Sequence, residues 1–277
     1  TMVNGENVTP KIRAVFDKMR QFSERVRSGE HNGHTGKAIT DVVNISIGGS
    51  NLGPQMLVTA LEPYAGSLRC HFVSNVDGTD IATTLKKLDP ETTLFIVGSK
   101  SFTTIETMTN AKTAKAWLVD ALGEAAVTQH FAGATIEPKK AEAFGLDPDH
   151  IFEFWTWVGG RFSSWSSIGL AVALYAGMDV FEQVLDGAYA MDTHFQTDDF
   201  RHHMPVLLAL LGIWYHIFVK AESYSVVCYD DTLKRLPTYL QQVDMESNGK
   251  CVFADGEPVN ISTGPIVWGD CGTNSQH

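Results

Sequence analysis

A short apolar run that changes abruptly into hydroxyl side chains decides the fold of this chain. The run reads Phe95-Ile96-Val97-Gly98-Ser99-Lys100-Ser101-Phe102-Thr103-Thr104-Ile105-Glu106. Its first part is typical of a buried strand, and Thr103 with Glu106 fits a capping box at a helix start. Because a helix start offers unpaired N–H groups and a partial positive charge, this loop could hold a phosphate; an ordinary polar loop is the alternative. The candidate ligands are Ser99, Lys100, Ser101 and Thr104.

The same order of strand, polar turn and helix recurs along the first half of the chain. Strands are predicted at residues 41–47, 70–74, 93–97, 130–135 and 151–154, and helices at 10–27, 81–88 and 104–122. A further helix follows the turn at 48–54, and Pro54 is expected in its first turn, where proline is tolerated. Alternating strands and helices predict an α/β fold, a doubly wound parallel sheet in three layers.

The pattern changes after Trp165. Apolar residues then recur about every 3.6 positions, which predicts helices at 166–176, 180–191 and 205–219. A strand at 225–229, a helix at 232–242 and a strand at 266–269 restart the first pattern. These changes divide the chain into residues 1–160, with an N-terminal helix and a first α/β domain, residues 161–222, a helical connection, and residues 223–277, an incomplete second α/β domain.

The charge of the chain argues against nucleic acid as a partner. Lys and Arg number 21 against 32 Asp and Glu, a net charge of -11 over 277 residues, whereas duplex binding needs clustered cations. The most apolar run, residues 204–219, contains Pro205 and His216 and is shorter than the ~20 residues of a membrane span. We expect a buried helix there and no membrane partner.

The N-terminal segment and the cysteines favour a cytoplasmic protein. The segment Thr1–Gly5 is polar and lacks the basic and then apolar pattern of a signal peptide. Cys70, Cys228, Cys251 and Cys271 form no C-x-x-C pair, so we expect reduced thiols in the core. The histidines are scattered without the spacing of metal ligands, and no metal is expected.

The glycine-rich turn at 48–54 raises the possibility of nucleotide binding. Gly48, Gly49 and Gly53 do not make G-x-G-x-x-G, and Pro54 stands where a P-loop needs lysine. A nucleotide-binding oxidoreductase is therefore only a third hypothesis. Ser50 remains a second candidate phosphate ligand, because ligands of open α/β sheets collect beyond the carboxyl ends of the strands.

Arg161 and Glu246 are candidate catalytic groups. Arg161 follows two glycines in Gly159-Gly160-Arg161-Phe162-Ser163, and a rigidly held guanidinium stabilises developing oxyanion charge. Pairing with a surface carboxylate is the alternative for this arginine. Glu246 lies with Asp244 in a segment that is expected to be a polar loop after a helix, and such a segment is more often a solvated turn than a catalytic site.

Five blocks of sequence resemble the glucose-6-phosphate isomerase family, in the family's order and over nearly the whole chain. They are Gly48–Ser50, Ser99–Thr104, Gly159–Ser163, Gln242–Lys250 and Gly272–His277. The resemblance implies two sugar isomerase (SIS) domains, each a parallel sheet flanked by helices. It also implies reversible exchange of glucose 6-phosphate and fructose 6-phosphate through a cis-enediol in glycolysis and gluconeogenesis, without metal or organic cofactor.

The resemblance assigns roles to single residues. Glu246 corresponds to the base that moves a proton between C1 and C2, a task that suits a carboxylate. Arg161 corresponds to the residue that stabilises the enediolate, and His277 to a histidine of ring opening that reaches into the neighbouring subunit's site, which implies a homodimer. The substrate-binding positions are Ser50, Ser99, Lys100, Ser101 and Thr104 at the phosphate and Gln242 at the sugar.

The family pattern extends beyond both ends of this sequence. A catalytic lysine that the family assigns to ring opening and closing has no counterpart here, so the resemblance implies that this chain lacks part of the second domain. The second hypothesis is therefore a non-catalytic sugar-phosphate-binding SIS module, or an inactive fragment of the isomerase.

Overall fold

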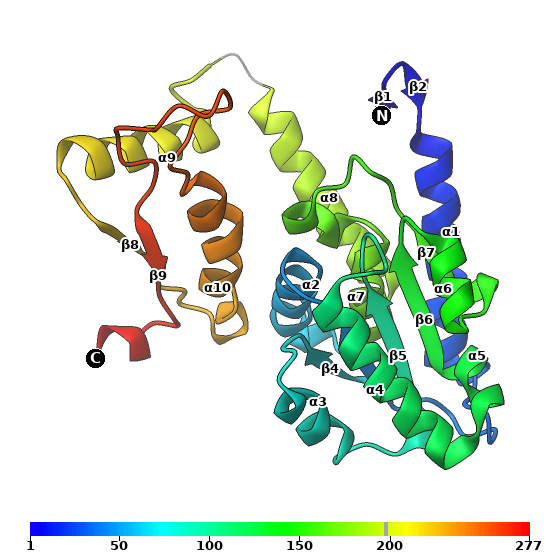
Figure 1. Cartoon of the computed structure of the whole chain (residues 1–277). Coiled ribbons are helices and arrows are strands. Elements are labelled where there is room, and N and C mark those ends of the chain that lie inside the picture. Colours follow the sequence, from blue (N-terminus) through cyan, green and yellow to red (C-terminus); the bar gives the residue numbers. More distant parts are fainter. Residues whose placement is uncertain (197–198) are drawn as a thin grey trace. The chain divides into compact units, whose positions relative to one another are not determined.

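Five parallel strands form the central sheet of the first part of the chain. A computed structural model describes residues 1–196 and 199–277, and the order across the sheet is β4–β3–β5–β6–β7 (Figure 1). All four neighbouring pairs are parallel. The bounds are β3 Asp41–Ile45, β4 Arg69–Val73, β5 Thr93–Gly98, β6 Phe131–Thr135 and β7 Ile151–Glu153. This arrangement confirms the predicted doubly wound α/β sheet.

Helices cover both faces of this sheet, which is why β3, β5 and β6 are buried along their whole lengths. Alternate residues of each strand point to opposite faces, so Val43 and Phe95 pack with α3, α4 and α6, while α1 and α7 lie on the other side. The bounds are α1 Thr9–Ser28, α2 Gly49–Ala60, α3 Gly78–Leu85, α4 Ile105–Leu122, α5 Val127–His130, α6 Pro138–Phe144, α7 Leu170–Ala176 and α8 Met178–Phe195. Three layers result.

Short elements complete this part of the chain. A two-stranded antiparallel pair, β1 Met2–Val3 and β2 Glu6–Asn7, precedes α1. Single 3-10 turns occur at Glu62–Tyr64, Pro90–Thr92, Glu124–Ala126, Pro148–His150, Gly160–Trp165 and Ser167–Gly169. The 3-10 segment Gly160–Trp165 lies between β7 and α7 in the sequence, and it carries the candidate arginine, Arg161.

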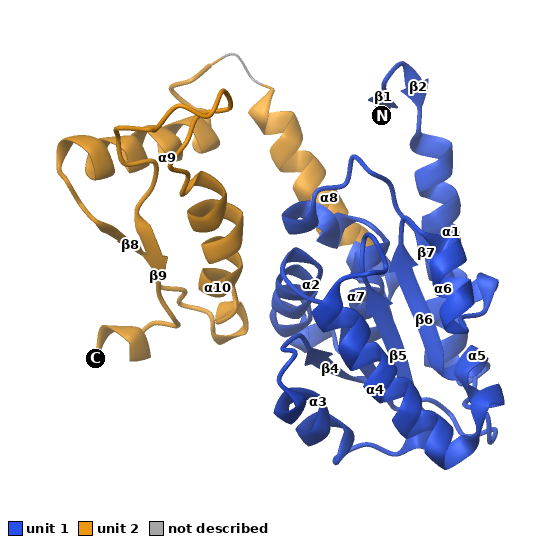
Figure 2. Ribbon diagram, viewed as in Figure 1, with its two compact units in different colours: residues 1–181 blue, residues 182–277 orange. Residues whose placement is uncertain are grey.

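The chain divides into two compact units, residues 1–181 and 182–277 (Figure 2). The second unit contains α9 Met204–Ile213, a π-helix Trp214–Phe218, β8 Ser223–Ser225, a 3-10 turn Asp231–Leu233, α10 Leu236–Leu240, a π-helix Gln241–Glu246, β9 Ile266–Trp268 and a 3-10 turn Asn274–Gln276. Its strands β8 and β9 pair in parallel. The domain boundaries at residues 160 and 222 stay a proposal.

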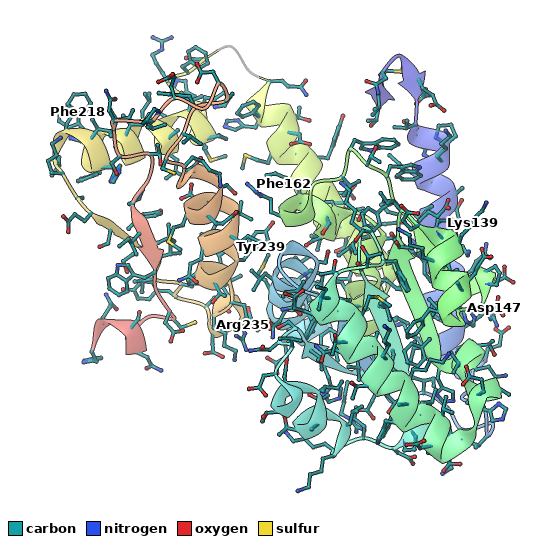
Figure 3. The ribbon with its side chains drawn as sticks, in the orientation of Figure 1. Lys139, Asp147, Phe162, Phe218, Arg235 and Tyr239 are labelled. Atoms are coloured by element: carbon teal, nitrogen blue, oxygen red, sulfur yellow. The ribbon has the colours of Figure 1, made fainter. Side chains whose placement is uncertain are left out.

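Helix α9 contradicts the prediction of a buried helix at residues 204–219. None of its residues is buried, and Leu208 is 63% exposed. Phe218, in the π-helix that follows, is 66% exposed (Figure 3). Its apolar side chains point in all directions, so burial would require neighbours on every side. The short strands and helices described in the second unit do not surround it. Among the described residues, no helix is both long and apolar enough to cross a membrane.

Three other predictions for local structure are wrong. The strand expected at 225–229 is β8 at Ser223–Ser225, and the polar loop expected around Asp244 is the π-helix that continues α10. Cys228 and Cys271 are buried, but Cys251 is exposed, so the prediction of a core position is wrong for Cys251. All four thiols are free.

Three histidines lie buried beside the amino-terminal ends of β6 and β7. His31 Nε2 donates to the Gln129 carbonyl oxygen (2.9 Å), and His150 Nδ1 donates to that of Thr128 (2.8 Å). His130 Nδ1 donates to the Thr93 carbonyl (2.7 Å), while its Nε2 accepts the main-chain N–H of His34 (2.8 Å). Because both ring nitrogens of His130 are used in this way, its imidazole must be neutral.

Burial is the main cause that lowers the pKa of His31, His130 and His150. The unfolded chain therefore binds more protons than the folded chain below about pH 6.5. We expect the free energy of unfolding of the first unit to fall as the pH drops from 7.5 to 5.5, by up to about 1.4 kcal/mol per pH unit for each histidine. Urea unfolding at the two pH values measures this change.

A matched pair of variants assigns the pH effect to the cluster. His130→Gln removes one of the three groups and should make the dependence less steep, whereas His202→Gln, at an exposed histidine, should leave it unchanged. Equal unfolding free energies of the unsubstituted chain at both pH values would show that the buried histidines do not control stability.

Candidate active site

Two polar turns meet at the edge of the sheet where the order of its strands reverses. The chain passes from β3 to β4 on one side and then to β5 on the other, so β3 and β5 are neighbours at the switch point. Their carboxyl ends are in register, with Ile45 beside Val97. A Cβ on Gly98 would lie 3.3 Å from the Cβ of Ser46. The turn after β3 and the loop after β5 therefore begin side by side, at the edge where open α/β sheets bind ligands.

Helix α2 begins immediately after the first turn. Gly48 adopts φ 60°, a conformation that favours glycine, and the helix starts at Gly49 without a side-chain cap. Pro54 lies inside α2, not in its first turn as predicted. A proline there provides no N–H for the Ser50 carbonyl, and the Ser46 hydroxyl donates to that carbonyl instead (2.9 Å). Asn44 Nδ2 in turn donates to Ser46 Oγ (2.7 Å).

The loop after β5 brings Ser99 and Thr104 together at the start of α4. Their hydroxyl oxygens lie 3.2 Å apart, and Ser99 is buried, with its N–H bonded to the Ala134 carbonyl (3.1 Å). The predicted capping box is wrong, because the residue before α4 is Thr104, which makes no side-chain cap, and Thr103 donates to Ser101 Oγ (2.8 Å). The first turn of α4 thus keeps its positive end without a capping oxygen.

Lys100 points from this loop towards the segment that follows β7. Its Nζ donates to the carbonyl oxygens of Thr156 (2.8 Å) and Val158 (2.9 Å). The main chain of Lys100 is also fixed, since its carbonyl accepts the N–H of Ile136 (3.2 Å) and the hydroxyl of Thr135 (3.1 Å). The ammonium is therefore engaged with protein carbonyls at this edge of the sheet.

Arg161 is positioned by a backbone contact with the start of α2. A Cβ on Gly49 would lie 2.1 Å from the Gly160 carbonyl oxygen and 2.5 Å from the Arg161 nitrogen. Only glycine allows this approach, because real Cβ contacts are essentially never shorter than 3.0 Å. Phe162, which follows Arg161, is 53% exposed (Figure 3). The structure thus places the arginine segment directly against the turn that carries Ser50.

Gln242 and Glu246 belong to the second unit, on the π-helix Gln241–Glu246. Gln241 Nε2 donates to the Val267 carbonyl of β9 (3.1 Å), which fixes this helix against the strand. Gln242 Oε1 is buried and has no hydrogen-bond partner among the described residues. Glu246 is exposed, with Lys250 Nζ 3.8 Å from its Oε1. Single π turns are rare and occur often at functional sites.

His277 ends the chain after the 3-10 turn Asn274–Gln276. Its N–H donates to the Asn274 carbonyl (3.1 Å), and the side chain is exposed. Gln276 accepts the Tyr229 hydroxyl through Oε1 (2.9 Å), which ties the terminal turn to its unit. In the part of the chain that the structure describes, no three His, Cys, Asp or Glu side chains are grouped as metal ligands.

The first unit therefore brings together Ser50, Ser99, Ser101 and Thr104 at the sheet edge and holds Arg161 beside them. Comparison with known proteins identifies the family of this chain. The family model described as phosphoglucose isomerase matches residues 1–277. The chain belongs to the phosphoglucose isomerase family.

The chain spans about half the length of two glucose-6-phosphate isomerases that it matches. A glucose-6-phosphate isomerase of Methylococcus capsulatus is 56% identical over 277 residues, which cover 99% of this chain and 51% of that protein. The crystal structure of a glucose-6-phosphate isomerase from Chlamydia trachomatis is 31% identical, with a TM-score of 0.86 over 100% of this chain and 52% of its own. A hypothetical protein of Thermus thermophilus is 29% identical, with a TM-score of 0.74 over 99% and 63%.

Sequence patterns did not identify two supports of this candidate site. Asn44 and Ser46, which hold the Ser50 carbonyl, lie at the end of a strand and look like ordinary strand residues. The contact of Gly49 with Gly160 joins segments more than 100 residues apart, so no local pattern predicts it. The signal for this contact that the sequence offers is a pair of adjacent glycines in each segment, Gly48-Gly49 and Gly159-Gly160.

Proposed function

We propose that this chain carries the phosphate anchor, the base and the charge-stabilising arginine of a glucose-6-phosphate isomerase. The observation that supports this most is the pair of hydroxyls of Ser99 and Thr104 at the uncapped start of α4, beside the start of α2. Two helix N-termini and several hydroxyls suit a phosphate better than a neutral ligand. The family match makes a hexose 6-phosphate the substrate of choice.

The proposed anchor would hold the unreactive end of the sugar. Ser50, Ser99, Ser101 and Thr104 would donate hydroxyl hydrogen bonds to the phosphate oxygens. The net charge of -11 gives no general attraction for anions, so local donors must provide the affinity. Binding energy at the phosphate would then position C1 and C2 for reaction.

The proposed reaction moves hydrogen within the open-chain sugar. Glu246 would take the proton from C2 of the aldose, and the C1 carbonyl would become a hydroxyl as the double bond of the cis-enediol forms. The same carboxylate would return the proton to C1 as the C2 hydroxyl loses its proton and becomes the ketone. The proton that the C1 oxygen gains equals the one that the C2 oxygen releases, and oxidation of C2 balances reduction of C1. Arg161 would stabilise charge on the enediolate oxygen, Gln242 would line the sugar site, and His277 would take part in ring opening.

The family resemblance also supports a homodimer, in which His277 reaches the neighbouring subunit's site, and a role in glycolysis and gluconeogenesis in the cytoplasm. The net charge of -11 argues against nucleic acid as a partner. A sedimentation experiment on the chain would establish its oligomeric state.

A coupled assay that converts fructose 6-phosphate to glucose 6-phosphate tests the proposed activity. Turnover by the 277-residue chain would support it. The second candidate is a sugar-phosphate-binding SIS module, which is considered because the chain spans about half the length of the glucose-6-phosphate isomerase that it matches. Calorimetric binding of fructose 6-phosphate without turnover would favour this candidate. If the chain shows no binding and no turnover, both candidate functions are refuted.

Loss of two hydroxyls at the start of α4 should weaken the anchor. We expect Ser99→Ala with Thr104→Val to lower the affinity for inorganic phosphate by at least about 100-fold, because two charge-assisted hydrogen bonds are lost and each contributes about 1.5–3 kcal/mol. Calorimetry measures the change. Thr113→Val, later in α4, removes a hydroxyl that bonds the Thr109 carbonyl and should leave the affinity unaltered; equal losses in both variants would contradict the anchor.

A further inference from the structure

Lys100 joins two segments that are far apart in the sequence. Its main chain belongs to the loop after β5, and its Nζ bonds the carbonyls of Thr156 and Val158 in the segment after β7. A lysine ammonium has three N–H donors, and two are used by these carbonyls. One donor is left for any other acceptor. Most of the hydrogen-bonding capacity of this ammonium is therefore used within the protein.

The bonded carbonyls belong to the segment between β7 and Arg161, in which Trp155 and Val158 also pack against a small buried cluster. Strand β7 ends at Glu153, and the next regular element begins at Gly160. Between them, the Val158 N–H donates to the Trp155 carbonyl (3.0 Å), and the rings of Trp155 and Trp157 stack in parallel, with centroids 5.1 Å apart. Thr156, Trp157 and Gly159 are exposed.

This segment leads directly into Arg161. Two residues after Val158, the Gly160 carbonyl rests against Gly49 and also accepts the Ser163 hydroxyl (2.6 Å). Lys100 therefore fixes the segment just before the arginine, and Gly49 fixes the arginine's own peptide. Only Gly159 and Gly160 separate this turn from Arg161.

We propose that Lys100 is a positioning residue that holds the segment carrying Arg161, and that its side chain is not a principal phosphate ligand. The consequence for catalysis rests on the function proposed above; the tethering role does not. Since the same loop supplies Ser99 and Thr104, Lys100 would couple the phosphate anchor to the group that stabilises the enediolate. A misplacement of about 1 Å at such a group is enough to slow a reaction by about 10²-fold.

Lys100→Met tests the tether, because methionine keeps most of the side-chain length and removes all three donors. We expect amide hydrogen exchange of residues 156–162 to become at least about tenfold faster, and the near-ultraviolet circular dichroism of the stacked tryptophans to weaken. The calorimetric affinity for inorganic phosphate should change by less than about threefold, since the lost ammonium is bonded to the carbonyls of Thr156 and Val158. Lys100→Arg, which keeps donors and charge, should restore the slow exchange.

Lys87→Met, at an exposed lysine after α3, removes the same charge and should change neither measurement. Unaltered exchange of residues 156–162 in Lys100→Met would overturn the tether, and a loss of phosphate affinity of tenfold or more would overturn the secondary role in binding. In the coupled assay, we expect kcat to fall and KM to stay nearly constant. If the unsubstituted chain lacks turnover, the proposed function fails for this chain, while the exchange experiment still decides the tether.

Discussion

Replacement of Glu246 by glutamine is expected to lower kcat for the conversion of fructose 6-phosphate by about 10³-fold, within the range that a positioned general base contributes. Glutamine has nearly the same shape as glutamate, but its amide does not accept the proton that must leave C1 of fructose 6-phosphate. The coupled assay measures the glucose 6-phosphate that is formed, and the substitution is made in a form of the protein that has turnover. Affinity for inorganic phosphate should change little, because the proposed anchor is on the first unit.

The fold should tolerate this substitution. Glu246 is exposed, and its contact with Lys250 is between side chains that are both more than half exposed, a kind of ion pair that contributes little stability. Glu257→Gln removes the same charge at another exposed glutamate of the second unit and provides the matched control. Normal turnover in Glu246→Gln would show that another group is the base.

Replacement of Gly49 by alanine is the second substitution with a large expected effect. The new methyl group would lie 2.1 Å from the Gly160 carbonyl oxygen and 2.3 Å from its carbon. Both are backbone atoms, so α2 and the arginine segment would have to separate. We expect the first unit to lose at least about 3 kcal/mol in urea unfolding, at the upper end of overpacking effects, and kcat to fall by about 10²-fold through displacement of Arg161.

The other glycine of this contact is a matched control. A Cβ on Gly160 would meet no heavy atom within 4 Å, so Gly160→Ala should change the unfolding free energy by less than about 0.5 kcal/mol. The two substitutions add the same group on opposite sides of one contact. Equal stability of both variants would mean that the close approach of the two segments is not required for folding.

The strands of the first unit could be predicted because their own residues carry the signal. Strand β3 is buried along its length by helices on both faces, so its run of apolar, mostly β-branched residues marks it in the sequence. The glycine and serine turns that end β3 and β5 predicted the edge of the sheet where the candidate ligands lie. Their spacing also excluded the common nucleotide-binding motifs.

The errors occurred where a tertiary contact decides between local alternatives. Thr103 with Glu106 fits a capping box, but α4 begins after Thr104, whose hydroxyl lies beside Ser99 and caps nothing. Pro54 lies inside α2 because the Ser46 hydroxyl, from the preceding strand end, takes the place of its missing N–H. Neither contact is visible in the sequence of the helix itself.

Composition alone also misjudged α9. Its residues are apolar enough for a core, yet burial depends on what surrounds a helix, and the described part of the second unit leaves Leu208 and Phe218 exposed. Lys100 is a similar case: its position in a hydroxyl-rich loop suggests a phosphate ligand, whereas its Nζ is bonded to two carbonyls after β7.

A crystal structure of the chain with bound fructose 6-phosphate tests the central claim most directly. The account predicts the phosphate at the carboxyl ends of β3 and β5, with its oxygens about 2.5–3.0 Å from the hydroxyls of Ser50, Ser99 and Thr104, and with Lys100 still bonded to the carbonyls of Thr156 and Val158. A phosphate bound away from these two helix starts, or the sugar ring seated there in its place, would contradict it.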